Sequence, residues 1–325
     1  MRTSPMDAPY AARDSPPCHL RDPLAHPPKA WHHGAVAARY EVIRTDDPLE
    51  THLLLDHEAK ARVVVAPPRG GMVTRFVVGD SNVLYLDAAT LRDQTKNVRG
   101  GIPVLFPIAG RLPDDKYVVD GTTFTMRQHG FARNMRWAIV DQATDGGARV
   151  GLSLSPTHVT RAQYPFEFRL EMTYLLADGH LTVRTRVRNL GERPMPVSPG
   201  LHPYFQLADA EKARARVRTD GTQAWDNRAG RVVPLATPID LTADVVDLHV
   251  LDHWPRTVRL TRPGDRDLEL ALGVPDRVLV IWTERGKDFV CVEPWMARGG
   301  ALSDGSAPTV PPGGTLETSF SIAAV

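Results

Sequence analysis

Residues 166–187 read FEFRLEMTYLLADGHLTVRTRV, and this stretch decides the fold. Apolar side chains take every second position on both sides of Gly179, with polar or charged side chains mostly between them. The alternating positions are Phe166, Phe168, Leu170, Met172 and Tyr174 before the glycine, and Leu181, Val183, Thr185 and Val187 after it. A period of two is typical of a strand with one buried face, and a glycine between two such runs marks a turn. The stretch therefore predicts an antiparallel hairpin with one buried and one solvated face.

Runs of the same kind recur along the chain, separated by glycine, proline, aspartate or asparagine. They lie at 61–65, 73–78, 83–86, 137–140, 150–154, 258–261, 268–272, 278–282, 289–293 and 316–322. Residues 87–92 show a short helical pattern. Many short antiparallel strands in a chain of 325 residues predict an all-β fold, a large antiparallel β-sandwich. Because no linker interrupts residues 39–325, we expect them to form a single domain.

Residues 1–38 differ in composition from the rest of the chain. They hold 7 of the 28 prolines and 4 of the 12 histidines, with few aliphatic side chains. So little apolar surface cannot offset the entropy of ordering the backbone. We therefore expect a disordered Pro/His-rich leader. It has no apolar segment of the kind that a secretory signal carries.

Charge and composition narrow the classes of partner. The chain has 39 Lys and Arg against 38 Asp and Glu, which argues against a nucleic-acid binder with a basic face and favours a small-molecule partner. No run is apolar over the length of a membrane helix, so no membrane partner is expected. The two cysteines, Cys18 in the leader and Cys291 in an apolar strand, suit a reducing compartment, and we expect a cytoplasmic protein.

The motifs of several common enzyme classes are absent. The chain has no GxSxG elbow, Walker loop, HExxH or dinucleotide-binding fingerprint. His249 and His253 are four residues apart, but Pro255 and the surrounding strand pattern remove the helix that would bring them together. The sequence therefore predicts no metal site and no phosphate-binding loop.

Two segments place a titratable residue where the local pattern favours another type. In DFVCVEPW (288–295), alternation puts Glu293 on the same face as Phe289 and Cys291. Such a carboxylate either has a function or turns into solvent at the strand end. In SPGLHPYF (198–205), His202 lies between a glycine and a proline that restrict the backbone. It is either a functional imidazole or a packed loop histidine.

Two further segments supply basic side chains. QHGFARN (128–134) contains His129 and Arg133 and reads either as part of a site or as an ordinary turn. RGGIPVLFPIAGRL (99–112) brackets an apolar, irregular loop with Arg99 and Arg111. Together the four segments offer an acid, a base and arginine donors without a nucleophile or a metal.

At these residues the chain resembles the aldose 1-epimerase (galactose mutarotase-like) family, near its hexose-6-phosphate mutarotase-like branch. The matching segments are 99–111, 129–133 with Trp137, 164–166, Asn189 with Gly191, 200–205 and 291–295. The resemblance implies a β-supersandwich that interconverts the α and β anomers of an aldose without a cofactor. Its HGFAR segment departs from the NxxHGG form of the galactose enzymes, which counts against galactose as the preferred sugar.

The resemblance also implies roles for individual residues. His202 matches the family's general acid and Glu293 its general base. His129, Arg99 and Arg111 match substrate-binding positions. An aspartate that holds sugar hydroxyls matches Asp247, or alternatively Asp252, and Arg133 lies in the matched HGFAR segment.

Mutarotation gives a proton to the ring oxygen, takes one from the anomeric hydroxyl, lets C1 turn and recloses the ring. An imidazolium with a pKa near 6.5 can donate and a carboxylate with a pKa near 4.3, raised by burial, can accept. We expect an aldohexose or aldohexose 6-phosphate as substrate and a monomer or homodimer. The alternatives are a non-catalytic carbohydrate-binding protein and a glycoside hydrolase or lyase, which normally needs two carboxylates.

Overall fold

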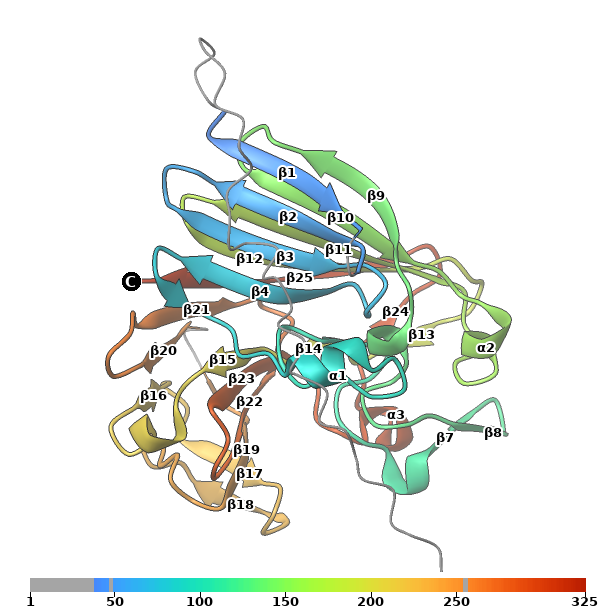
Figure 1. Cartoon of the computed structure of the whole chain (residues 1–325). Helices are drawn as coiled ribbons and strands as arrows, with labels where there is room; N and C mark the ends of the chain where they lie inside the picture. Colours follow the sequence, from blue (N-terminus) through green and yellow to red (C-terminus); the bar gives the residue numbers. More distant parts are fainter. Residues whose placement is uncertain (1–37, 47–48, 254–256) are drawn as a thin grey trace, which may run out of the picture. The chain divides into compact units, whose positions relative to one another are not determined.

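The 166–187 stretch forms the hairpin β11 (Phe168–Ala177) and β12 (His180–Asn189) (Figure 1). The computed structural model describes residues 38–46, 49–253 and 257–325. In the hairpin, Leu170 lies opposite Val187 and both are fully buried. The turn residues Asp178 and Gly179 have φ values of 51° and 74°, as a two-residue hairpin turn that follows the strand twist requires. The predicted hairpin is confirmed, although its first strand begins at Phe168 rather than at Phe166.

This hairpin lies in an eight-stranded sheet whose strands pair in the order β16-β20-β21-β25-β12-β11-β10-β9. The other strands of this sheet are β16 (Arg216–Arg218), β20 (Thr257–Thr261), β21 (Leu268–Leu272), β25 (Thr315–Ala324), β10 (Ala148–Leu154) and β9 (Ala138–Ala143). A five-stranded sheet, drawn in blue and cyan, lies over the β9–β12 part of it (Figure 1). Its strands are β1 (Tyr40–Thr45), β2 (Thr51–Asp56), β3 (Ala61–Ala66), β4 (Met72–Val78) and β5 (Ser81–Asn82).

A second eight-stranded sheet carries most of the residues discussed below. Seven strands pair in the order β18-β17-β19-β22-β23-β14-β6, and β15 also pairs with β23. They are β18 (Arg231–Pro234), β17 (Gln223–Asp226), β19 (Val245–Val250), β22 (Val278–Glu284), β23 (Phe289–Trp295), β14 (Gly200–Leu201), β6 (Val104–Leu105) and β15 (Tyr204–Gln206). Every ladder between strands of the described residues is antiparallel, so the predicted all-β antiparallel fold is confirmed.

Smaller elements connect these sheets. Two short pairs are β7 (Lys116–Val119) with β8 (Thr122–Thr125), and β13 (Met195–Pro196) with β24 (Thr309–Val310). The α-helices α1 (Ala88–Arg92), α2 (His158–Arg161) and α3 (Ala301–Asp304) are each about one turn long. The predicted turn at 87–92 is confirmed as α1, because the Asp87 carboxylate accepts the N–H groups of Ala89 and Thr90 and caps it. None of the helices in the described part of the chain is long and apolar enough to cross a membrane.

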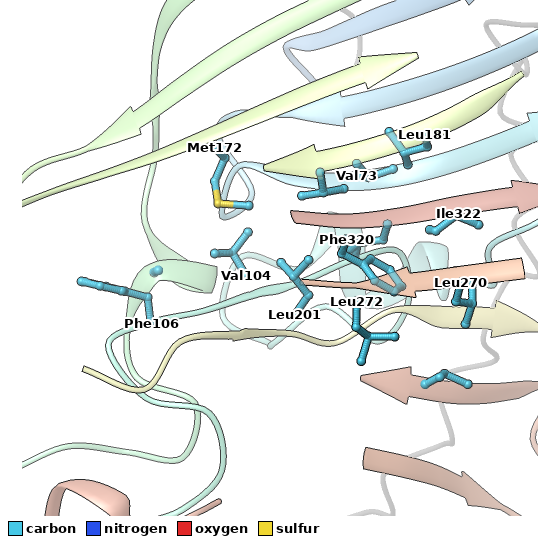
Figure 2. Close-up of a cluster of buried hydrophobic side chains, with 14 of the residues drawn as sticks. Val73, Val104, Phe106, Met172, Leu181, Leu201, Leu270, Leu272, Phe320 and Ile322 are labelled. Atoms are coloured by element: carbon cyan, nitrogen blue, oxygen red, sulfur yellow. The ribbon is translucent and has the colours of Figure 1, made fainter. Parts of the chain in front are cut away.

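The hydrophobic core is formed by the inward faces of the three large sheets. Figure 2 shows Val73 of β4 close to Leu181 of β12, with Phe320 of β25, Leu272 of β21 and Leu201 of β14 in the same cluster. Burial of side chains from strands far apart in sequence is what joins the sheets, at about 25 cal/mol for each Å² of apolar surface removed from water.

Residues 83–86 and the leader differ in how the structure bears on their predictions. The predicted strand at 83–86 is wrong: β5 ends at Asn82, and only Leu84 and Leu86 make isolated bridges, to Phe205 and Gly100. The segment leaves its sheet because its backbone groups bond alternately to β15 and to the loop before β6. The predicted leader falls almost wholly on residues 1–37, which lie outside the described residues, so its disorder stays a prediction.

Candidate active site

A cavity of about 590 Å³ opens on one face of the β17-β19-β22-β23 sheet. Its walls include all seven residues selected from the sequence and assigned a role: His202, Glu293, His129, Arg99, Arg111, Arg133 and Asp247. These residues come from segments almost 200 positions apart. The fold therefore brings together at one place the side chains that the sequence offered separately.

The sheet register builds the floor of the cavity from two rows of residues. One row crosses four strands as Trp225, His249, Val280 and Glu293. The next row crosses as Asp247, Trp282, Cys291 and Tyr204. Residues in one row project from the same face of the sheet because they are directly opposite one another in the ladders.

Glu293 is buried on the cavity face of β23, with an exposed fraction of 1%. Alternation along β23 sends Val292 to the hydrophobic core and leaves Glu293 on the cavity side, as predicted. Its Oε2 accepts a hydrogen bond of 3.0 Å from Nε1–H of Trp295. Burial raises the pKa of Glu293 well above its ordinary value, and the charge of Asp247 raises it further. Glu293 does not turn into solvent at the strand end.

His202 lies in the connection between β14 and β15 and is 9% exposed. Its backbone N–H donates to the carbonyl of Pro103 over 3.0 Å, and its ring stacks on Tyr204 with centroids 4.6 Å apart. Nδ1 is buried 3.4 Å from Oε1 of Glu293, which leaves Nε2 as the nitrogen available to a ligand in the cavity. These contacts fix the plane of the ring between its two partners.

The protonation of His202 differs from the sequence expectation of a pKa near 6.5. Burial lowers the pKa of His202 to about 3, and the positive charges of Arg133 and Arg99 contribute to the shift. The free imidazole is therefore neutral near pH 7, and burial favours the protonated form of its partner Glu293. In that state the pair holds one proton, with a donor and an acceptor 3.4 Å apart.

His129 projects from a turn in which it has a φ of 68° and Gly130 a φ of 65°. Its Nδ1 accepts a 3.0 Å hydrogen bond from the N–H of Gly110, so a neutral ring carries its proton on Nε2. The ring meets those of His202 and Trp295 edge to face, with centroids 5.5 and 5.6 Å away. Burial lowers the pKa of His129 well below its ordinary value, and His202 and nearby arginines add to the effect. Nε2 of His129 lies 3.2 Å from the side-chain amide nitrogen of Gln128, which also lines the cavity.

Four arginines of the described residues line the cavity: Arg99, Arg111 and Arg133, selected from the sequence, and Arg298, which was not. Within the described part of the chain, none of the four forms an ion pair with a carboxylate. Arg133 donates to the carbonyl of Gln128 over 2.9 Å, while Arg298 lies over the ring of Trp225 at 4.3 Å. The cavity wall therefore carries positive charge that its own residues leave unpaired.

The structure separates the two candidate aspartates. Asp247 lines the cavity, where it accepts a 2.8 Å hydrogen bond from Asn227 and lies 3.2 Å from Nε2 of His249. Asp252 instead accepts the N–H groups of Thr222 and Gln223 and the hydroxyl of Thr222, which closes the loop before β17. Asp252 does not line the cavity. Asp247 is the aspartate placed to contact a ligand.

Several residues that line the cavity had not been selected from the sequence as part of a site. They are Trp225, Asn227, His249, Trp282 and Arg298. For His249 a signal existed, because it shares a strand face with Asp247 two positions earlier. The others are recognisable only once the sheet order is known.

Known proteins are similar to this chain over most of its length. The sequence model of the family described as aldose 1-epimerase matches residues 51–313. The chain belongs to this family. It is an isomerase of the aldose 1-epimerase class. This family membership decides against the two alternative predictions, a non-catalytic carbohydrate-binding protein and a glycoside hydrolase or lyase.

Two curated relatives bear the name "Putative glucose-6-phosphate 1-epimerase". The protein of Cenchrus ciliaris is 26% identical over 72% of this chain and 68% of its own length. That of Salmonella typhimurium is 27% identical over 66% of this chain and 73% of its own length.

Solved structures give the same fold for this epimerase-family chain. The Slr1438 protein of Synechocystis sp. PCC 6803 has a TM-score of 0.82 and 33% identity, over 87% of this chain and 98% of that one. A galactose mutarotase-like protein of Clostridium acetobutylicum has a TM-score of 0.73 and 17% identity, over 88% and 98% of the two chains. The predicted galactose mutarotase-like sandwich is thereby confirmed.

Proposed function

We propose that this chain interconverts the α and β anomers of an aldohexose 6-phosphate, with His202 as general acid and Glu293 as general base. The observation that carries the proposal is a buried acid–base pair, 3.4 Å apart, in a cavity whose four arginines have no carboxylate partner among the described residues. The names of the two curated relatives support a phosphorylated hexose. Arginine forks suit phosphate oxygens better than neutral hydroxyls.

The reaction needs only the one proton of the pair. In the reactive form that proton sits on His202, so that Nε2–H donates to the ring oxygen while the Glu293 carboxylate takes the proton of the anomeric hydroxyl. The bond between C1 and the ring oxygen breaks and an open-chain aldehyde forms. After rotation about C1–C2, both protons return along the same paths and the ring closes on the other face. Each group contributes roughly 10²–10⁴ in rate.

A bound phosphate also favours the reactive form. Arg99 and Arg133 lower the pKa of His202 through their positive charges. A phosphate dianion on these arginines compensates those charges, so the imidazolium becomes less costly when substrate is bound. His129 donates to a sugar oxygen, Asp247 accepts from a sugar hydroxyl, and Arg111 is a further donor to the sugar or its phosphate.

The test compares two sugars by anomeric exchange in NMR, with and without enzyme. Glucose 6-phosphate should have a clearly lower KM than glucose, and the difference should shrink as salt rises. Arg99→Ala should remove most of the difference by raising the KM for glucose 6-phosphate. Arg231→Ala, an exposed arginine of β18 outside the cavity lining, is the matched control and should change neither. Equal KM values at low salt would exclude the phosphate and leave the free aldohexose as substrate.

The partner and location of the enzyme follow from the same chemistry. We propose a small-molecule sugar phosphate as its partner and the cytoplasm as its location, since Cys291 is a buried free thiol that needs no oxidising compartment. A monomer or homodimer remains our expectation for the assembly.

A further inference from the structure

Three different metal-ligand types converge beside the cavity. The ligand atoms of His202, Cys291 and Glu293 all lie within 4.8 Å of one another. Cys291 and Glu293 project from the same face of β23, and the pairing of Tyr204 with Cys291 brings the β14–β15 connection alongside. The strand pairings therefore bring the three side chains together.

The spacing suits a tetrahedral metal ion. Zinc binds nitrogen and oxygen at about 2.0–2.2 Å and sulfur at about 2.3 Å, so two of its ligands lie roughly 3.3–3.8 Å apart. Nδ1 of His202 and Oε1 of Glu293 are already 3.4 Å apart. Sγ of Cys291 lies within 4.8 Å of the other two ligand atoms, so a shift of at most about 1 Å brings it to the ligand spacing.

An unsatisfied atom points to the same place. Nδ1 of His202 is buried and makes no hydrogen bond within the described residues, although Glu293 lies opposite it. Buried polar nitrogens are normally hydrogen-bonded. A lone pair held there, on a ring that Tyr204 keeps in plane, is available to a metal ion.

We propose that His202, Cys291 and Glu293 form a binding site for Zn²⁺ or a similarly thiophilic divalent ion, and that this ion inhibits the enzyme. The inhibition rests on the proposed function, because the ion occupies both members of the acid–base pair. Zn²⁺ accepts lone pairs from Nδ1, a carboxylate oxygen and the thiolate, and two protons leave to solvent: the S–H proton of Cys291 and the proton held by the His202–Glu293 pair. No oxidation occurs. The fourth position takes a water molecule.

Direct binding is tested with Cd²⁺, whose bond to a thiolate gives an ultraviolet charge-transfer band. The full chain should develop this band on titration with Cd²⁺. Cys18→Ser, which removes the other cysteine of the sequence, should keep the band, and Cys291→Ser should lose it. Cys291→Ala is the second variant, since a hydroxyl in this apolar setting can impair folding. A band that persists in both Cys291 variants, or that disappears in Cys18→Ser, would overturn the site.

Inhibition is tested with Zn²⁺ in the anomeric exchange assay. The Zn²⁺ concentration for half inhibition should rise roughly tenfold or more in the Cys291 variants. Mutation of residues that only support a metal ligand already lowers metal affinity by about this factor. A chelator should restore the rate of the wild-type chain. Unchanged inhibition in folded Cys291 variants contradicts the proposal. The wild-type chain could instead show no mutarotase activity while the Cd²⁺ band still disappears in the Cys291 variants. That result supports the metal site and contradicts the proposed function.

Discussion

At the scale of single residues, burial moves the two central pKa values in opposite directions. The pKa of Glu293 is raised and that of His202 is lowered, because each loses more by being charged than it gains from its neighbours. The pair therefore keeps one proton over a wide range of pH. A glutamate and a histidine with ordinary pKa values would together hold one proton only between about pH 4.3 and 6.5.

The first prediction concerns the proposed base. Glu293→Gln should lower the rate of anomer exchange by roughly 10²–10⁴, because the amide has the same shape but cannot take a proton. Binding of the sugar, measured by calorimetry, should remain. Glu284→Gln on the adjacent strand β22 makes the same chemical change away from the cavity lining and should leave the rate unaltered. Near-normal turnover in Glu293→Gln removes this residue from the mechanism.

The second prediction concerns the dependence of activity on pH. Below the His202 pKa of about 3 both groups hold a proton and none can accept, whereas above the raised pKa of Glu293 the pair has lost its proton and cannot donate. With glucose, which does not titrate in this range, kcat/KM should therefore persist below pH 4.3, toward the His202 value of about 3. The measurement is a pH profile corrected for the spontaneous reaction, with circular dichroism to verify folding. An acid limb near 4.3, the ordinary carboxylate value, in a chain that is still folded contradicts this assignment.

The sequence predicted the position of Glu293 but not the protonation of His202. Alternation along β23 is a local property, so the face of Glu293 could be read from its neighbours. The pKa of His202 depends on burial and on Arg99 and Arg133, which lie 103 and 69 positions earlier. No local pattern contains that information.

At the scale of elements, the turn that presents His129 depends on a glycine. Gly130 has a φ of 65°, and its backbone bridges to Phe106 in the loop after β6. A Cβ at Gly130 would overlap the carbonyl oxygen and carbon of Phe106. This close approach keeps the two chain segments together and so fixes the direction of the His129 ring.

The third prediction uses a matched pair of glycines. Gly130→Ala should lower the free energy of unfolding by about 3 kcal/mol or more, since the new methyl group meets backbone that cannot rotate away. Gly230→Ala has the same φ, 64°, but open space around its Cβ, and should cost only about 1 kcal/mol for the left-handed conformation. Thermal and urea unfolding measure both values. Equal losses would show that the contact with Phe106 contributes nothing.

Elements were predictable where their pairing is local. The β11–β12 hairpin was recognised from alternation and one glycine, and its register follows from the turn. Residues 83–86 form a short apolar run, but Leu84 and Leu86 make only isolated bridges, to Phe205 of β15 and to Gly100, so pattern alone predicted a strand that does not form. Trp225 and His249 become neighbours of Glu293 only through the order of four strands. Nothing within a single strand specifies that order.

At the scale of the whole molecule, the cavity combines a rigid floor with charged walls. The paired strands β17, β19, β22 and β23 form the floor. The arginines come from the segments that connect the strands around it. Glu293 lies on β23, and His202 lies in the short connection between β14 and β15, which both pair with β23, so the acid–base pair is held in place by the sheet. Loops can contribute phosphate donors because a phosphate accepts hydrogen bonds from several directions.

The last prediction concerns the first 38 residues. The described residues that line the cavity all lie between positions 97 and 299, so we expect chemistry and substrate binding without the leader. Its composition provides too little apolar surface to contribute to a core. A chain that starts at Arg39 should therefore keep kcat/KM and the melting temperature of the full chain. The two are compared by NMR exchange and calorimetry under the same conditions. A melting temperature lower by many degrees would mean that residues 1–38 pack against the rest, and a loss of kcat/KM alone would mean that they reach the cavity.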